Sequence, residues 1–337
     1  MLYIVISFLF LAIVLYFLLG GADFGAGIIE LFTSEKNKSR TRKTSYQAIG
    51  PIWEANHMWL IIAVVIMFVA FPTMYSTMCT YLHIPLLIML MGITARGTAF
   101  AFRNYDAIKG ENTQRIYNNV FVYSSFITPL FLGIIAGSAI SRQIDPGATS
   151  FTDAYIFSWL NYFSVAVGLF TVALSGYLAA IYLIGEADND HDARRFIIKA
   201  KAMNILAVVF GGLVFIASEI EHIRLAHWIF GNPVSLIAVI AASISLIASW
   251  VLINKGKRKI IRIGAGFQVT MILLAVGYMH YPYLVMIKGG QNLSMFAYHA
   301  PQKTIEVLGW GLLIGSILIL PSLFYLYYSF QKKEIVY

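Results

Sequence analysis

The chain has 337 residues, of which 59% are hydrophobic and only 12% are charged, and its mean hydropathy is +0.75. Soluble domains are close to half apolar and a quarter charged, so this composition excludes a soluble domain and predicts an all-α polytopic membrane protein. The net charge of +8 would suit a nucleic-acid-binding protein, but the cations follow a membrane topology and no nucleic-acid partner is expected.

Nine apolar runs of about 20 residues are each long enough to cross a bilayer as a helix. They lie near residues 2–32, 55–79, 81–102, 117–140, 156–184, 203–222, 233–254, 263–286 and 305–330. The first eight spans could form two four-helix bundles, over residues 1–140 and 156–286. Residues 305–337 would then form a peripheral ninth helix and a tail.

Lysine and arginine are concentrated in alternate connections of this predicted topology. Nineteen of the 24 cationic residues fall in the first, third, fifth and seventh connections and the C-terminal tail, whereas the other loops hold four. Cytoplasmic loops carry the excess of cations in membrane proteins. We therefore expect the N-terminus outside and the C-terminus in the cytoplasm.

The first apolar span is too long for one straight crossing. A helix over residues 3–32 would measure on the order of 45 Å, against a hydrocarbon core of about 30 Å. The sequence GGADFGAG at residues 20–27 is the predicted point of bending. Gly21 and Gly25 form a small-xxx-small pair that favours close approach of another helix. Asp23 falls near the inner edge of the membrane, and Glu30 lies two turns further on the same face.

The second span opens with the sequence GPIWEANHMWL at residues 50–60, where a Gly-Pro pair is compatible with a first helical turn. Its first turns carry Glu54 and His57. Together with Asp23 of the first span and Arg96 of the third, they place four ionisable groups at the cytoplasmic edge. Ionisable groups at membrane depth are costly and usually functional. They could form a proton entry route. Alternatively they form a structural cluster, with Arg96 neutralising Asp23 and Glu54 facing its own helix dipole.

Metal and haem sites are weaker interpretations. Glu54-x-x-His57 and Glu219-x-x-His222 each resemble half of a di-iron motif, but the topology separates them by most of a bilayer, so we expect no metal site. Cys79 is the single cysteine, which excludes an internal disulfide or a CxxC pair. Outer-face histidines could ligate haem in a stand-alone cytochrome b, although capping roles are the simpler interpretation. They are His83, His222, His227, His280 and His299.

The sequences GGADFGAGIIE at residues 20–30 and GPIWEANHMWL at residues 50–60 resemble subunit II of the cytochrome bd-type quinol oxidases. The similarity covers nearly the whole chain. It continues through Phe71-Pro72, Arg96-Gly97 and Phe102-Arg103, and more weakly through Tyr281-Pro282-Tyr283 and Asn292-Leu293-Ser294. The resemblance implies a bacterial cytoplasmic membrane and the same plan of two four-helix bundles with a peripheral helix.

The resemblance also implies a heterodimer with a homologous subunit I that carries two b-type haems and a d-type or third b-type haem. That complex oxidises quinol and reduces dioxygen to water with cytoplasmic protons. This chain would be a haem-free scaffold without a catalytic residue, with room for a structural quinone or lipid. A small single-helix accessory subunit is a further partner that the family implies.

The same resemblance assigns roles to the four ionisable residues. Asp23 matches the acid of the family's first motif, and Glu54 occupies the acidic position of the second; both are proton-path candidates. Arg96 matches an arginine of the third helix, whereas His57 is glutamine in some members. A proton-coupled secondary transporter is the alternative function, because it would share the carboxylates and the arginine. Such transporters usually place their charges near the midplane, not at one edge.

Overall fold

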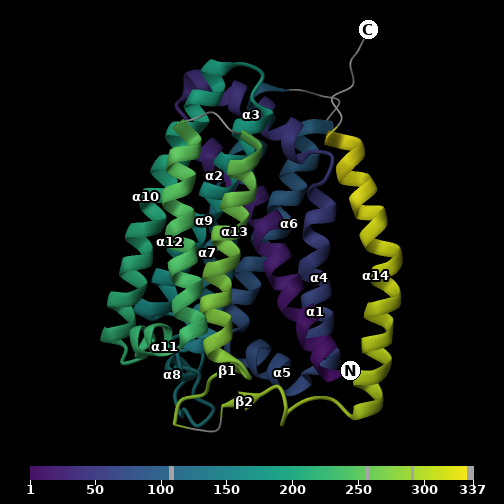
Figure 1. The fold of residues 1–337 in the computed structure, drawn as a ribbon, viewed down its shortest axis with the longest axis vertical. Helices are drawn as coiled ribbons and strands as arrows, with labels where there is room; N and C mark the ends of the chain where they lie inside the picture. Colours follow the sequence, from purple (N-terminus) through teal and green to yellow (C-terminus); the bar gives the residue numbers. More distant parts are fainter. Residues whose placement is uncertain (106–109, 255–257, 290–291, 332–337) are drawn as a thin grey trace.

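The computed structural model describes residues 1–105, 110–254, 258–289 and 292–331. Within these residues nine helices are long and apolar enough to cross a membrane, which confirms the predicted all-α fold with nine spans. The helices run roughly along one direction, and the start of α1 (Leu2–Leu15) and the end of α14 (Gln302–Gln331) lie at opposite ends of the molecule (Figure 1). An odd number of crossings requires this arrangement.

The first half of the chain contains four of the candidate spans. Its elements are α1 (Leu2–Leu15), a π-helical turn η1 (Tyr16–Gly20), α2 (Gly21–Leu31), α3 (Glu35–Ile49), α4 (Trp53–Ala70), α5 (Pro72–Tyr81), α6 (His83–Tyr105) and α7 (Glu111–Ile140). The polar α3 lies at the end of the molecule where α14 ends (Figure 1). The distribution of lysine and arginine predicts that this end faces the cytoplasm.

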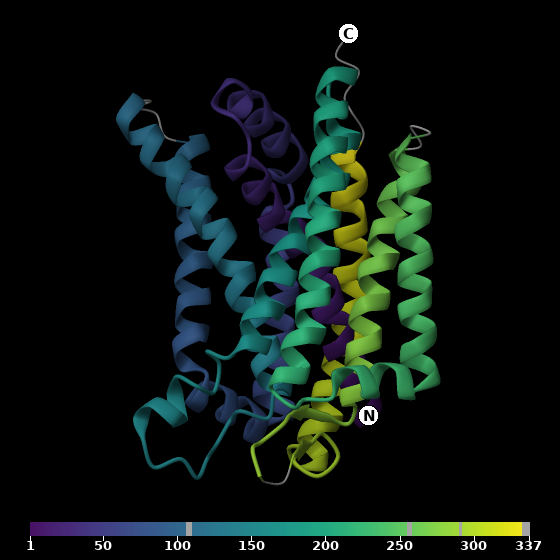
Figure 2. The same cartoon turned by 90° about the vertical axis from the view of Figure 1, so that its left-hand side faces the viewer.

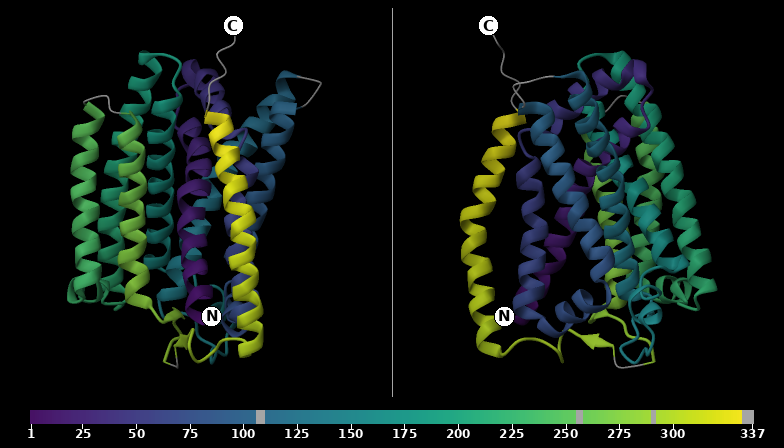
Figure 3. Two further views of the ribbon diagram at one scale, coloured as in Figure 1. Left: turned by 45° about the vertical axis from the view of Figure 1, so that its right-hand side comes forward. Right: turned by 180° about the vertical axis from the view of Figure 1, so that it is seen from behind.

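The second half contains the other five candidate spans and a small hairpin. Its elements are α8 (Phe151–Tyr155), α9 (Tyr162–Glu186), α10 (Asp190–Ile220), α11 (Leu225–Gly231), α12 (Pro233–Asn254), α13 (Arg258–His280), β1 (Tyr283–Val285), β2 (Leu293–Ser294) and α14 (Gln302–Gln331). The two strands pair antiparallel, with Tyr283 opposite Ser294. Helix α14 stands at the edge of the molecule beside α1 and α4 (Figure 3).

The ends of several predicted spans were wrong. The second span does not run unbroken to residue 79, because Pro72 lacks an N–H and disfavours a helical conformation at Phe71, which has φ −130° and ψ 57°. The fifth helix begins at Tyr162, not 156, because the Asn161 side chain caps it by accepting from the Ser164 N–H at 2.8 Å.

The sixth and eighth spans also differ from the prediction. The sixth helix starts at Asp190 rather than 203, since Asn189 caps a polar first section by accepting from the Asp192 N–H at 2.9 Å. The eighth ends at His280 rather than 286, because the chain from Tyr283 enters the strand pair. Hydropathy locates the apolar part of a helix, whereas local capping and pairing decide its ends.

The first span forms the centre of the molecule. It contains the π-helical turn at Tyr16–Gly20, directly before the predicted bending segment, and residues 21–30 of α2 are all buried. Helix α2 packs between α7 and α9. A Cβ on Gly25 would lie 1.9 Å from the carbonyl oxygen of Ser175 on α9, which confirms the close approach predicted from the small residues. The division into two four-helix bundles stays a prediction.

Candidate functional site

Asp23 is the buried acid at the start of α2, and two of the predicted residues meet it. Its Oδ1 accepts a hydrogen bond from Arg96 Nη2 at 2.7 Å, and its backbone oxygen accepts a second from the same nitrogen at 3.1 Å. The His57 Nε2 atom lies 3.2 Å from Asp23 Oδ2. Helices α2, α4 and α6 therefore bring a carboxylate, an imidazole and a guanidinium together, as the sequence predicted.

Arg96 is among the largest fully buried side chains. Its Nε donates to Ser125 Oγ on α7 at 3.1 Å, and the Phe24 and Phe121 rings lie 5.2 and 5.0 Å from its guanidinium carbon. A buried cation is tolerable only when it is paired and its donors are satisfied. The Asp23 carboxylate supplies that pairing, which agrees with the structural interpretation of the cluster.

His57 connects the buried pair to the surface of α4. Its side chain is 16% exposed, whereas that of Asp23 is 0% exposed. Its ring packs against Tyr16, Phe24 and Trp53 at centroid distances of 6.0, 5.3 and 6.4 Å. Its Nδ1 atom and the Tyr16 hydroxyl are buried without a hydrogen-bond partner among the described residues, and ordered water is the usual partner of such atoms.

Glu54 does not join the buried trio. It is exposed in the first turn of α4, one turn before His57, and in the described structure it shares no ion pair with the other three predicted residues. The face of α4 that packs inward carries Asn56, Trp59 and Ala63. Glu54 lies off that face, so the four predicted residues divide into a buried trio and one exposed acid.

A second ion-pair network surrounds the buried Glu30 two turns along α2, and the sequence reasoning missed its partners. Glu30 is fully buried; its Oε2 accepts from Arg103 Nη1 at 3.0 Å and its Oε1 from Arg42 Nε at 2.9 Å. The sequence spacing of the acids and arginines could have predicted the Glu30–Arg103 pair. Asp23 and Glu30 are seven residues apart on one helix, as are Arg96 and Arg103 on another.

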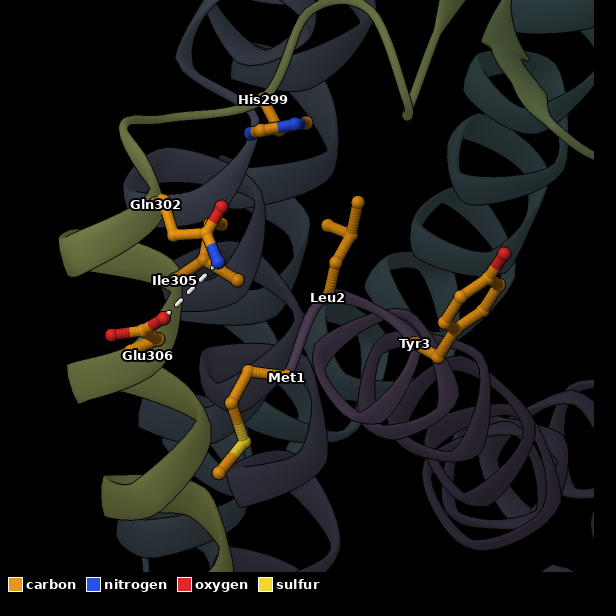
Figure 4. Close-up of a pocket in the computed structure, with 7 residues that line it drawn as sticks. All are labelled: Met1, Leu2, Tyr3, His299, Gln302, Ile305 and Glu306. Carbon is orange, nitrogen blue, oxygen red and sulfur yellow. Dashed lines mark hydrogen bonds between the residues drawn. The ribbon is translucent and has the colours of Figure 1, made fainter.

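The opposite end of the molecule holds a small cavity between the start of α1 and the start of α14 (Figure 4). Its volume is about 230 Å³. The Gln302 amide donates to Glu306 there at 3.1 Å. The lining residues are Met1, Leu2, Tyr3, His299, Gln302, Ile305 and Glu306. The cavity lies at the far end of α1 from Asp23, so it belongs to a different region of the protein.

Two of the outer histidines have a local hydrogen-bond partner. His83 Nδ1 lies 2.8 Å from the Thr80 carbonyl oxygen, and His299 Nδ1 lies 2.7 Å from that of Ala300. The buried His280 ring packs edge-on against Trp228 at 5.4 Å, and its two ring nitrogens have no hydrogen-bond partner among the described residues. Over the described ranges, no group of three or more His, Cys, Asp or Glu residues is placed to hold a metal ion.

Comparison with known proteins decides the family. The sequence model for the cytochrome bd terminal oxidase subunit II family matches residues 1–330. The chain belongs to this family. It is 25% identical over 336 residues to the cytochrome bd ubiquinol oxidase subunit 2 of Bacillus subtilis, covering 98% of this chain and 95% of that protein.

Two further matches agree with this assignment. The cytochrome bd-I ubiquinol oxidase subunit 2 of Escherichia coli K12 is 24% identical over 166 residues, which is 48% of this chain and 43% of that protein. A chain of the bd oxidase structure from Geobacillus thermodenitrificans has the same fold, with a TM-score of 0.71 at 21% identity, over 96% of this chain and 98% of that chain.

This bd-family subunit II is therefore a multi-pass membrane component of a bacterial respiratory quinol oxidase. Membership implies a subunit I partner within the oxidase complex. The interpretations as a transporter or a stand-alone cytochrome b are set aside. The roles of individual residues do not follow from membership alone.

Proposed function

We propose that this subunit II is a haem-free scaffold that stabilises subunit I and gives cytoplasmic protons an entry path towards it. In this proposal the haems, two b-type and a d-type or third b-type, reside in subunit I, where quinol is oxidised and dioxygen reduced. This chain would hold a structural quinone or lipid instead, and a single-helix accessory subunit would complete the complex.

A graded series of titratable groups supports the proton path. Glu54 is exposed at the predicted cytoplasmic end of α4, His57 one turn further is 16% exposed, and Asp23 beyond it is 0% exposed. A proton taken up by Glu54 could reach the imidazole at Nδ1 and leave Nε2 for Asp23 Oδ2, which is 3.2 Å away. The contact between Asp23 and His57 is the observation that carries this proposal.

The guanidinium of Arg96 supplies the positive charge beside Asp23, at the buried end of the proposed proton path. An opposite charge within about 4–6 Å favours the ionised form of a carboxylate, and Arg96 Nη2 lies 2.7 Å from Asp23 Oδ1. Arg96 and His57 therefore contact different oxygens of the Asp23 carboxylate, and Oδ2 is the point at which the proposed relay from His57 Nε2 reaches it.

The test uses the assembled oxidase carrying Glu54→Ala, Asp23→Asn and the two together. We expect oxygen consumption with saturating quinol to fall about tenfold or more in the double variant, because positioned proton transfer contributes at least that much. The haem absorption spectrum should be unchanged. Glu35→Gln is a matched control, since Glu35 is an exposed acid at the same end that pairs with Lys38. Wild-type turnover in the double variant would contradict the path.

A further inference from the structure

Tyr16 is a buried aromatic residue that contacts His57 of the candidate site from the preceding helical segment. It lies in η1, the turn between α1 and α2, and is 4% exposed. Its ring centroid lies 6.0 Å from that of His57, with the two planes tilted by 55°. The first span runs through the middle of the molecule, with the α6–α7 hairpin on one side and the α12–α13 hairpin on the other (Figure 2). Tyr16 therefore contacts His57 inside the protein rather than at its lipid-facing surface.

The π-helical turn η1 determines which face of the span Tyr16 occupies. Two turns of a regular α-helix take about seven residues, so such a helix would place Tyr16 on the face of Asp23, seven residues later. In η1 the Gly21 N–H donates to the Tyr16 carbonyl oxygen, five residues back, so the two turns contain one residue more. Tyr16 accordingly shares the face of Phe24, and the two rings meet edge to face at 6.4 Å.

Gly20 leaves the space that the Tyr16 ring occupies. A Cβ on Gly20 would lie 2.7 Å from Tyr16 Cε2 and 2.9 Å from Tyr16 Cδ2, whereas packed heavy atoms approach to about 3.5–4.0 Å. A larger residue at position 20 would therefore push the ring out of its place. The turn and the glycine together hold an aromatic ring beside His57, and π-helical turns are frequent at functional sites.

The His57 imidazole depends on packing for its orientation. The torsion that turns an imidazole about its bond to Cβ has broad energy wells, so the surrounding contacts select the orientation. His57 Nδ1 has no hydrogen-bond partner among the described residues, and Nε2 lies 3.2 Å from Asp23 Oδ2. Three rings pack against the imidazole, and Tyr16 is the one that η1 adds to Phe24 of α2 and Trp53 of α4.

We propose that Tyr16 is a positioning residue whose ring, placed by η1, holds the His57 imidazole with Nε2 towards Asp23. The Tyr16 hydroxyl is buried without a hydrogen-bond partner in the part of the chain that the structure describes, so the ring is the part of the side chain that acts on His57. The effect of Tyr16 on turnover rests on the proposed proton path, whereas the placement of the imidazole is measured separately.

The test compares Tyr16→Leu with Tyr16→Phe in the assembled oxidase. Diethyl pyrocarbonate modifies accessible imidazoles, and mass spectrometry of the peptide that contains His57 gives the labelling rate of this residue. We expect Tyr16→Leu to raise that rate severalfold, because the imidazole is then free to turn away from Asp23. Turnover should fall by up to about tenfold, since proton transfer needs a held geometry. Tyr16→Phe keeps the ring and should restore wild-type labelling and turnover.

Two further variants keep the test decisive. Gly20→Ala displaces the Tyr16 ring without removing it, so it should raise the labelling rate of His57 even if Tyr16→Leu fails to assemble. Phe17→Leu is the matched control, because Phe17 lies in the same turn with its ring beside Gly21. This control should label His57 at the wild-type rate.

The variant His57→Gln, alone and with Tyr16→Leu, shows whether Tyr16 acts through His57. If it does, the double variant turns over no more slowly than His57→Gln alone, whereas a general packing role would add its own loss. Unchanged labelling in Tyr16→Leu, additive losses of turnover, or a Tyr16→Phe variant that behaves like Tyr16→Leu would overturn the proposal. Faster labelling with wild-type turnover in both Tyr16→Leu and His57→Gln would support the positioning role and refute the proton path.

Discussion

Replacing Gly25 by alanine tests the close packing of α2 on α9, which positions the candidate site. The added Cβ would lie 1.9 Å from the Ser175 carbonyl oxygen and 2.7 Å from the Ala179 Cβ. Non-bonded heavy atoms pack best about 3.5–4.0 Å apart, so the two helices would have to separate by about 1 Å or more. The obstacle is the backbone of a buried helix, which cannot rotate away as a side chain can.

Inserting a methyl group into a packed core costs about 1–3 kcal/mol, occasionally more. We expect Gly25→Ala to reach the upper end, about 3 kcal/mol, because the contact is with backbone. The separation would also shift Asp23, two residues earlier, away from Arg96. The purified complex should therefore unfold several degrees lower in a fluorescence-detected size-exclusion melt, and its turnover should fall with its stability.

Gly212→Ala on α10 is the matched control. A Cβ there would meet no heavy atom within 4 Å, and alanine is favoured over glycine within a helix by about 1 kcal/mol. This variant should melt at or slightly above the wild-type temperature. If Gly25→Ala has the same melting temperature as Gly212→Ala, the close α2–α9 contact and the reasoning built on it are wrong.

Two further perturbations follow from the buried charges. Asp23→Ala leaves Arg96 as an unpaired buried cation, which should destabilise the complex by about 3–5 kcal/mol and lower its melting temperature. Adding Arg96→Met should restore part of the lost stability. If the double variant is no more stable than Asp23→Ala, the broken pair is not the cause of the loss. Lys199 donates to the carbonyl oxygens of Ile29 and Phe32 at 3.2 and 3.0 Å at the end of α2. Lys199→Met should cost about 1–3 kcal/mol and speed amide exchange at residues 29–33, whereas unchanged exchange would deny it a capping role.

The number and order of the spans could be predicted because bilayer thickness alone sets the length of an apolar run. Their ends could not, because capping and strand pairing act locally on a few residues. Pro72 shows that a proline can break a span whose hydropathy continues. Asn189 shows the reverse, since it starts a helix well before the apolar section begins.

The site was predictable to the extent that its residues are costly in a membrane. The sequence singled out Asp23 and Arg96 because buried charges need a partner, and the structure pairs them. The position of Glu54 depends on the rotation of α4 about its axis, which tertiary packing sets. The partners of Glu30 depend on where Arg42 of the polar α3 comes to lie, and hydropathy carries no information on that point.

The paired charges of α2 and α6 form a ladder that fixes the register of the two helices. Asp23–Arg96 and Glu30–Arg103 have the same sequence separation of 73 residues, as expected where the first and third spans run in the same direction. Phe121 of α7 contacts both guanidinium groups. A slip of one helix by a turn would break both pairs at once, so these buried charges specify one register, a use for which buried ions are best attested.

Asp23 belongs both to the ion-pair ladder and to the proposed proton path, and this determines which variant can test proton transfer alone. Any change at Asp23 alters the ladder as well as the proposed path, so a loss of turnover there has two physical explanations. Glu54 is exposed and has no ion-pair partner among the residues described, so its removal leaves the ladder intact. Slow turnover in Glu54→Ala at an unchanged melting temperature, restored by Glu54→Asp, can only come from the path. Normal turnover in Glu54→Ala, with Asp23→Asn slow and unstable, would leave the cluster a purely structural device.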